Sequence, residues 1–280
     1  MSAITPEITL PRERRRAPGS LAAIRTLAGR RFALTARTPR ELVVPLLTPV
    51  LFALVIAPAL KKALHTNASY ESYVAVGTIG LLIPLNTMFS GLSVIVDRES
   101  GAGRELLAAP IGRPLIVFGN LLIALATTAL QVGVLLVFAD LRRIHFNASA
   151  TGALWFVAAG VLFAIAMYGV AETLASRVPR TEEYIARLPA IAIVPWFLAG
   201  SLFPITALPL GLEWFARFLP LTHALALMRY GLLGDSSGLA SIWKGSDPTM
   251  MAFLSLLVVA GFALLLTRVS IRVFTKAAVR

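Results

Sequence analysis

Ionisable side chains of both signs interrupt two long apolar runs in the segment Asp97–Arg113, DRESGAGRELLAAPIGR. Charges of both signs are mixed over its first nine positions: Asp97, Arg98, Glu99, Arg104 and Glu105. Such side chains form ion pairs and charged hydrogen bonds with another protein surface. We expect a short helix over Arg98–Leu107. Leu106, Leu107 and Ile111 would then insert into a groove on a partner, and Glu99, Arg104 and Glu105 would make polar contacts at its rim. The alternative is a solvated loop that only completes the topology, and the pattern allows both.

Side chains suited to catalysis or metal binding are few. The chain has no cysteine, which excludes disulfides, thiolate zinc sites and cysteine nucleophiles. Its three histidines, His65, His145 and His223, have no metal-like spacing, and there is no H-E-x-x-H motif. No Ser–His pair has a spacing typical of a nucleophile with its base. We therefore expect no catalytic, metal-binding or cofactor-binding residues.

The composition indicates the environment in which the charged segment must be held. The chain is 57% hydrophobic and 14% charged, with a mean hydropathy of +0.79. Soluble domains carry about 25% charged residues. The sequence therefore predicts an all-α polytopic membrane protein. The net charge of +12 does not indicate nucleic acid as a partner, because the basic residues follow a membrane pattern.

Apolar runs predict six transmembrane helices, since about 20 apolar residues cross a bilayer. The run Ser72–Val96 and the run Pro114–Ala139 flank the charged segment and contain no charged residue. A short connection between two such helices predicts an antiparallel hairpin. The fifth span is shortened by internal prolines. The six predicted spans are residues 42–60, 72–96, 115–139, 151–172, 188–203 and 249–267.

The part before the first span is divided in two. Residues 1–20 are polar and basic and predict a flexible cytoplasmic tail, followed by a single transmembrane domain over residues 21–280. Residues 21–40 combine apolar positions at helical spacing with Arg25, Arg30, Arg31 and Arg37. This pattern predicts an amphipathic helix in the membrane interface that also contacts lipid head groups. A cytoplasmic helix packed on protein is the alternative.

The basic residues predict the orientation of the six spans. With the N-terminus inside, the cytoplasmic segments hold 19 of the 26 Lys and Arg residues, and the outer segments hold 7. This bias predicts that both termini and the loop 97–114 are cytoplasmic, in a multi-pass protein of the plasma (inner) membrane. Arg142 and Arg143 are the exception, because this orientation places them outside.

An apolar segment between the fifth and sixth spans is interrupted by proline. Residues 204–234 contain Pro204, Pro209 and Pro220. Apolar chain that does not span the membrane is typical of a re-entrant element. We expect two short helices, about 209–218 and 221–233, that dip into the outer leaflet. Aromatic side chains would anchor them at head-group depth: Trp214, Phe215 and Phe218.

Four isolated polar residues each allow two interpretations. We expect Glu172 to lie near the cytoplasmic surface, as a helix end cap or a partner contact. Asn86 and Gln131 lie in charge-free spans and either line a cargo path or form hydrogen bonds between helices. His223 fits a packing role better than that of a ligand or proton relay.

Two motifs resemble a known family. The first follows the second span and contains Glu99, Gly101, Gly103, Leu106, Leu107, Pro110 and Arg113. The second precedes the last span and contains Phe203, Pro204, Leu208, Pro209, Pro220, Leu221, Thr222, His223 and Arg229. Together they resemble permeases of the ABC type-2 exporter family, in the branch of drug-resistance and nodulation-factor exporters. The sequence departs from the family pattern in having a glycine, Gly101, two rather than four residues after Glu99, although Gly103 lies at the fourth position.

The resemblance implies an efflux system with separate subunits. In this family the first motif forms the coupling helix, on which two ATP-binding subunits dock, and the permease pairs with a second copy of itself or with a sister chain. This chain has no G-x-x-x-x-G-K-[ST] loop, so ATP and Mg²⁺ are expected on the partner subunits. The charge-free spans favour a hydrophobic or amphipathic cargo, such as a drug, a lipid or a saccharide-bearing lipid.

Two other classes remain open from the residues alone. An integral-membrane enzyme would need a nucleophile and base or a metal site in the membrane, and neither is evident. A secondary transporter would be expected to have internal repeats or an intramembrane carboxylate, and neither is clear in this sequence.

Overall fold

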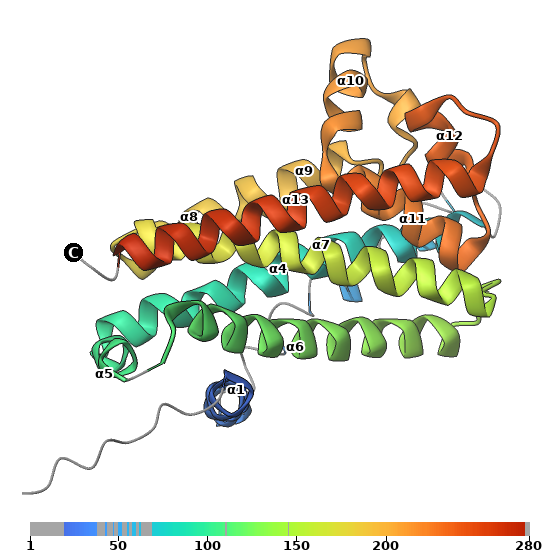
Figure 1. The fold of residues 1–280 in the computed structure, drawn as a ribbon. Coiled ribbons are helices and arrows are strands. Elements are labelled where there is room, and N and C mark those ends of the chain that lie inside the picture. Colours follow the sequence, from blue (N-terminus) through green and yellow to red (C-terminus); the bar gives the residue numbers. More distant parts are fainter. Residues whose placement is uncertain are drawn as a thin grey trace, which may run out of the picture.

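The computed structural model describes residues 20–37, 69–109, 111–144 and 146–277, with eight further positions between residues 43 and 62 (Figure 1). Every regular element in these residues is a helix, so the predicted all-α fold is confirmed for this part of the chain. The predicted tail, except Ser20, and most of the predicted span 42–60 lie outside the described residues.

Four long helices form the body of the protein and lie side by side (Figure 1). They are α4 (Ser69–Glu99), α6 (Arg113–Leu141), α7 (Ala150–Arg177) and α13 (Pro248–Ala277). Each is long and apolar enough to cross a membrane. All four extend beyond the predicted ranges 72–96, 115–139, 151–172 and 249–267, because their polar end turns continue the helix past the apolar run. In α4 72% of the apolar window is buried and in α13 28%, so α4 is the more central.

The central helices pack through glycine. A Cβ added to Gly231 would lie 2.4 Å from the carbonyl oxygen of Gly152, and one added to Gly152 would lie 2.3 Å from that of Gly231. Gly152 belongs to α7, and Gly231 belongs to α11 (Pro220–Leu233). Helices in lipid associate through close contact of small residues, since lipid is as apolar as leucine. These two glycines therefore allow the backbones of α7 and α11 to touch.

The predicted fifth span, 188–203, is not one regular helix. The chain forms α8 (Thr181–Leu188), the π-helical turn η2 (Pro189–Ile193) and α9 (Val194–Leu198). Pro195 has no N–H to donate to the carbonyl of Ile191, and the turn before it widens, so that the Val194 N–H donates to Pro189. The helix therefore begins seven residues before the predicted start and ends five before the predicted end.

Short helices gather at one end of the bundle, opposite to α5 (Figure 1). They are η3 (Ile205–Ala207), α10 (Leu210–Phe218), α11 and α12 (Ser237–Trp243). Helix α11 is almost entirely buried, whereas α10 exposes more than half of Trp214, Phe215 and Phe218. The bounds of α10 and α11 are close to the expected ranges 209–218 and 221–233.

Helix α1 (Ser20–Arg37) crosses the bundle, and it is seen nearly along its axis in Figure 1. Its Leu27 packs so closely on α6 that a Cβ at Gly119 would lie 2.8 Å from the Leu27 Cβ. The opposite face exposes 82% of Leu21 and 64% of Phe32. The helix is thus packed on protein along one face and presents apolar side chains on the other.

The expected helix Arg98–Leu107 is wrong in its bounds. Helix α4 continues to Glu99, and a separate helix α5 (Ala102–Ala108) follows a turn. The turn is at Gly101, whose φ of 79° is in the left-handed region that glycine adopts without strain. A Cβ at Gly103 would lie 3.2 Å from the Asp97 carbonyl oxygen, so α5 folds back on the last turn of α4.

Candidate functional site

Arg98 closes the end of a neighbouring helix. Its guanidinium donates to the carbonyl oxygens of Ala175 at 3.1 Å, Val178 at 2.6 Å and Pro179 at 3.1 Å. The last carbonyls of a helix have no donor within the helix, and a cation there also favours the negative end of the helix dipole. Arg98 therefore fixes the end of α4 to the turn between α7 and α8.

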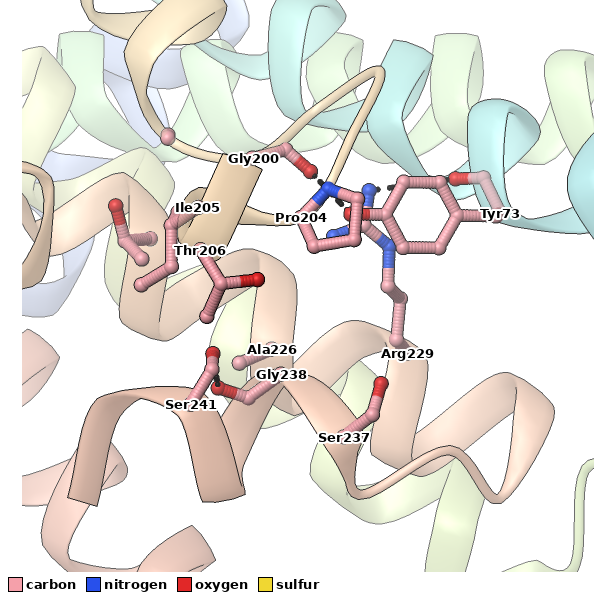
Figure 2. Close-up of a pocket in the computed structure, with 12 residues that line it drawn as sticks. Tyr73, Gly200, Pro204, Ile205, Thr206, Ala226, Arg229, Ser237, Gly238 and Ser241 are labelled. Atoms are coloured by element: carbon pink, nitrogen blue, oxygen red, sulfur yellow. Dashed lines mark hydrogen bonds between the residues drawn. The ribbon is translucent and has the colours of Figure 1, made fainter. Parts of the chain in front are cut away.

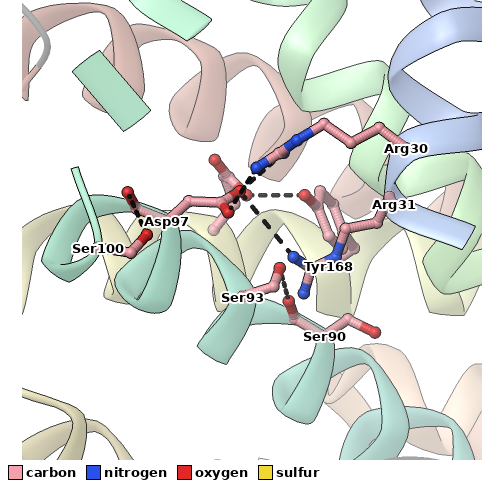
Figure 3. Close-up of polar contacts among 8 residues, drawn as sticks. Arg30, Arg31, Ser90, Ser93, Asp97, Ser100 and Tyr168 are labelled. Carbon is pink, nitrogen blue, oxygen red and sulfur yellow. Dashed lines mark hydrogen bonds and ion pairs between the residues drawn. The ribbon is translucent and has the colours of Figure 1, made fainter. Parts of the chain in front are cut away.

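Asp97 binds the amphipathic helix α1. Its carboxylate accepts two hydrogen bonds from Arg30, at 3.0 and 3.4 Å, and Nη1 of Arg31 lies 3.9 Å from it (Figure 3). The side chains of Asp97 and Arg31 are 13% and 12% exposed and that of Arg30 is 35% exposed, so the contact is partly shielded from solvent. Partial burial strengthens the attraction between such charges and makes the loss of one partner costly.

Glu99 contacts a third element. The hydroxyl of Thr181, the first residue of α8, donates to the two carboxylate oxygens of Glu99 at 3.3 and 3.4 Å. Successive residues on a helix point about 100° apart. Asp97, Arg98 and Glu99 therefore reach α1, the end of α7 and the start of α8 from one turn of α4.

The remaining residues of the expected coupling segment differ in their surroundings. Arg104 and Glu105 are exposed on α5, and Leu106 is half-buried. Arg113 donates from Nη1 to the carbonyl oxygen of Thr275 at 3.1 Å, which ties the start of α6 to the end of α13. The side chain of Leu107 and all of Pro110 lie outside the described residues.

A cavity of about 360 Å³ opens beside this segment. Asp97, Arg98 and Arg104 form a polar part of its wall, and Ile116 and Phe274 form an apolar part. The end of α4 is therefore not packed solid against α6 and α13, and space exists there for side chains to move.

The expected position of Glu172 near the surface is wrong. Glu172 is fully buried in α7, and the hydroxyl of Tyr168 donates to its Oε2 at 2.7 Å. Its Oε1 is buried and has no hydrogen-bond donor among the described residues. Residue 172 lies about one and a half turns before the helix end and not at it, because α7 extends five residues past the predicted span. The buried position and the bond to Tyr168 favour a packing role over that of an end cap or partner contact.

At the opposite end of the bundle, Arg229 is a buried cation. It is 3% exposed, and its Cζ lies 3.4 Å from the centroid of the Tyr73 ring. Its Nη2 donates to the carbonyl oxygens of Ser201 at 3.0 Å and Tyr73 at 3.4 Å. The ring face and the carbonyl dipoles stabilise the charge. Arg229 thus holds α11, α4 and the loop after α9 together.

A second cavity, of about 290 Å³, adjoins Arg229. Figure 2 shows the guanidinium of Arg229 beside Tyr73 and Pro204, with Thr206, Ser237 and Ser241 arranged around the remaining space. The Tyr73 hydroxyl donates to the Gly200 carbonyl at 2.8 Å, which closes one side. The cavity therefore combines one cation with several hydroxyl groups.

His223 occupies a satisfied packing position. Its Nε2 lies 2.9 Å from the carbonyl oxygen of Arg217 and therefore donates. Its Nδ1 therefore accepts from the Ser255 hydroxyl at 3.2 Å, and the oxygen of that hydroxyl accepts from Trp243 Nε1 at 2.8 Å. Burial lowers the pKa of His223 below its ordinary value of 6.5. The neutral ring is thus favoured, and the described residues contain no His, Asp or Glu cluster able to hold a metal ion.

The three prolines of the second motif stand at the starts of the short helices. Pro204 and Pro209 immediately precede η3 and α10, and Pro220 is the first residue of α11. Proline suits these positions because its missing N–H would have no acceptor in a first turn. Phe203 is exposed and Leu208 half-buried in the connections between these helices.

Asn86 and Gln131 are buried inside the bundle, at 3% and 2% exposure. Asn86 of α4 donates to the hydroxyl oxygens of Thr127 and Thr128 on α6. This contact matches the interpretation of a hydrogen bond between helices for Asn86. Neither residue lines the two cavities described above.

Sequence reasoning missed several partners of these residues. Arg30 was expected at lipid head groups and instead binds Asp97, while Thr181, Tyr73 and Ser255 received no role. The opposite charges of Arg30 and Asp97 are a signal that pairing was possible. No sequence signal identifies the carbonyl acceptors of Arg98 and Arg229, because every residue has a carbonyl group.

The chain resembles known transport proteins over most of its length. The sequence pattern of the ABC-2 type transporter family matches residues 22–233. The ycf38 protein of Porphyra purpurea, which is named as a transport permease, is 27% identical over 212 residues that cover 74% of this chain and 72% of that protein. The family match extends from α1 to the end of α11 and so includes both ends of the bundle described above.

Proposed function

Because this chain belongs to the ABC-2 type transporter family, and is therefore the membrane subunit of an ABC transporter, we propose that it exports a hydrophobic or amphipathic cargo. The family pairs such a subunit with an ATP-binding subunit, and this argues against the membrane-enzyme and secondary-transporter alternatives. In this proposal the partner binds ATP and Mg²⁺, and this chain converts movement of the partner into movement of its helices. The cargo class is inferred from the charge-free apolar spans.

The observation that carries the proposal is the set of contacts made by Asp97, Arg98 and Glu99. One turn of α4 is bonded to α1, to the end of α7 and to the start of α8. A force on α5 reaches this turn through Gly101, and from there it reaches three other helices. Arg104 and Glu105 remain exposed on α5 and are the side chains that we assign to contact with the ATP-binding subunit.

We propose six spans with both termini in the cytoplasm. The four long helices supply spans two, three, four and six, the region of α8, η2 and α9 supplies the fifth, and residues 42–60 supply the first. The excess of basic residues in the cytoplasmic segments supports this orientation in an inner membrane. It puts α5 at the cytoplasmic face and makes α10 and α11 outer re-entrant helices.

We also propose a complex of two permease subunits, two copies of this chain or one copy with a sister chain, and two ATP-binding subunits. Helices α6 and α13 each expose apolar side chains along much of their length, with 33% and 28% of their apolar windows buried. These faces are available to lipid and to a second permease. Asn86 and Gln131 remain candidates for a cargo path, although the hydrogen bonds of Asn86 favour a packing role.

The experiment compares an exposed charge pair on α5 with one at the other end of α6. The double variant Arg104→Ala/Glu105→Ala is reconstituted in liposomes with the ATP-binding subunit that co-purifies with the wild-type chain. We expect weaker co-purification of that subunit and at least about a tenfold loss of permease-stimulated ATP turnover, since about 1.4 kcal/mol corresponds to tenfold in binding. Thermal unfolding should be unchanged, because neither side chain is buried.

The matched control is Asp140→Ala/Arg142→Ala, which removes one exposed acid and one exposed base from the far end of α6. We expect normal association and turnover from it. Full coupling in the α5 variant, or an equal loss in the control, would contradict the assignment of α5 as the docking helix.

A further inference from the structure

The cavity beside Arg229 contains a cation that has no ion-pair partner among the described residues. The buried Nε–H of Arg229 also has no hydrogen-bond acceptor among them. A guanidinium that is 97% shielded from solvent is normally paired with an anion. The side chain itself forms part of the cavity wall, so an anion in the cavity would face the guanidinium.

Hydroxyl groups complete the wall. The hydroxyls of Thr206 and Ser237 make no hydrogen bond to any described residue, and that of Ser241 donates to the Gly238 carbonyl at 2.7 Å and keeps its lone pairs free. Two free donors and one free acceptor beside a cation suit an oxyanion that carries its own hydroxyl groups.

The charge of the ligand is limited by Asp235. Arg229 is the one charged residue among the described residues of the cavity wall, and the carboxylate of Asp235 lies next to that wall, where it accepts a hydrogen bond from the N–H of the lining residue Ser237 at 2.8 Å. A second negative charge in the cavity would be repelled by Asp235 without a second cation to offset it. The surroundings therefore favour a ligand with one negative charge, which matches a phosphodiester better than a phosphate monoester or a free phosphate ion.

We propose that the cavity formed by Tyr73, Thr206, Arg229, Ser237 and Ser241 binds the phosphodiester of a hydroxyl-bearing head group. The phosphate oxygens face Arg229, and the head-group hydroxyls bond to the serine and threonine side chains. Such a group is found in glycerol-type phospholipids and in phosphate-linked glycans. The site lies at the opposite end of the bundle from α5. Ligand binding in this cavity therefore does not require the ATP-binding subunit that we assign to α5.

Thermal unfolding of the purified chain in neutral detergent tests the proposal. The probes are glycerophosphoglycerol, a soluble diester, dihexanoyl phosphatidylglycerol, a lipid with the same head group, inorganic phosphate, and glycerol. We expect saturable stabilisation by both diesters, and an apparent Kd for inorganic phosphate at least about tenfold weaker, which corresponds to about 1.4 kcal/mol. Stabilisation by the lipid alone would identify a membrane lipid as the source of the group. Equal stabilisation by glycerol would overturn the proposal.

Three variants localise the effect. Arg229→Gln removes the cation and is expected to weaken diester binding at least about tenfold. Because Arg229 also ties three elements together, Ser241→Leu provides a second variant that fills the cavity while leaving Arg229 in place, and it should abolish the stabilisation. Lys244→Gln removes an exposed cation from the same end of the bundle, outside the cavity wall, and should bind normally. Diester binding that survives Ser241→Leu, or that is lost equally in Lys244→Gln, would place the ligand elsewhere.

Discussion

The guanidinium of Arg98 lies 2.6 Å from the carbonyl oxygen of Val178, eighty residues away in the chain. This bond joins the last turn of α4 to the turn between α7 and α8. The end of the second predicted span is therefore coupled directly to the end of the fourth.

Replacing Arg98 by alanine should therefore destabilise the protein. Three carbonyl oxygens would lose a charged donor, and we expect the free energy of unfolding to fall by about 1–3 kcal/mol, because hydrogen bonds from charged groups are the stronger ones. Thermal unfolding in mild detergent measures the change. Arg177→Ala is the control, since Arg177 is an exposed arginine in the last turn of α7. Equal effects of the two variants would contradict a specific role for Arg98.

Replacing Asp97 by asparagine should release α1 from the bundle. The variant keeps the shape of the side chain but loses the charge that holds Arg30 and Arg31. We expect amide hydrogen exchange in residues 20–37 to become about tenfold faster, a loss of about 1.4 kcal/mol of local stability. Glu105→Gln removes an exposed acid from the neighbouring helix and should leave this exchange rate unchanged. Unaltered exchange in Asp97→Asn would show that α1 is held by its contacts with α6 alone.

The contact between α7 and α11 should not tolerate a methyl group. Gly231→Ala would place a Cβ 2.4 Å from the Gly152 carbonyl oxygen, which forces two helix backbones apart. Overpacking of this kind costs about 1–3 kcal/mol, and contact with backbone atoms favours the upper part of this range. Thermal unfolding is again the measurement. Gly261→Ala on α13, where nothing lies within 4 Å, should be neutral or slightly stabilising. A neutral Gly231→Ala would mean that the helices separate easily.

The stability of the protein should fall on acidification through His223. Its pKa in the folded state is lowered below 6.5 by burial, so the unfolded chain takes up the proton first as the pH falls. The contribution of the neutral ring is present above the unfolded pKa and is lost progressively below it. The difference in midpoint temperature between wild type and His223→Gln should therefore shrink between about pH 7.5 and about pH 5. A constant or growing difference would contradict this assignment of the neutral form.

Local sequence patterns were sufficient to predict the positions of some helices. The apolar runs predicted the positions of α4, α6, α7 and α13, because a helix that crosses a membrane must be apolar over its whole length. Proline marked the starts of η3, α10 and α11, since its missing N–H costs nothing in a first turn. The same residue misled the interpretation of α8 and α9, because prolines inside a helix can be absorbed by a wider turn rather than ending the element.

The position of a helix end depends on more than apolar character. The polar turn Asp97–Glu99 extends α4 past its apolar run because its three side chains find partners on other helices. Glu172 appeared to lie near the surface because the apolar run stops there, yet α7 continues and neighbouring helices cover it.

Apolar runs and the positions of charged residues are enough to predict a helical membrane protein, the location of its long apolar helices and the segments that carry charge. The partners of those charges become visible only when the helices are packed together. Arg98 reaches carbonyl groups 77 to 81 residues away, and Arg229 reaches Tyr73 across 156 residues. Such pairings depend on which helices pack together and at what depth. A hydrophobic period or a charge pattern, which describes only neighbouring residues, does not contain that information.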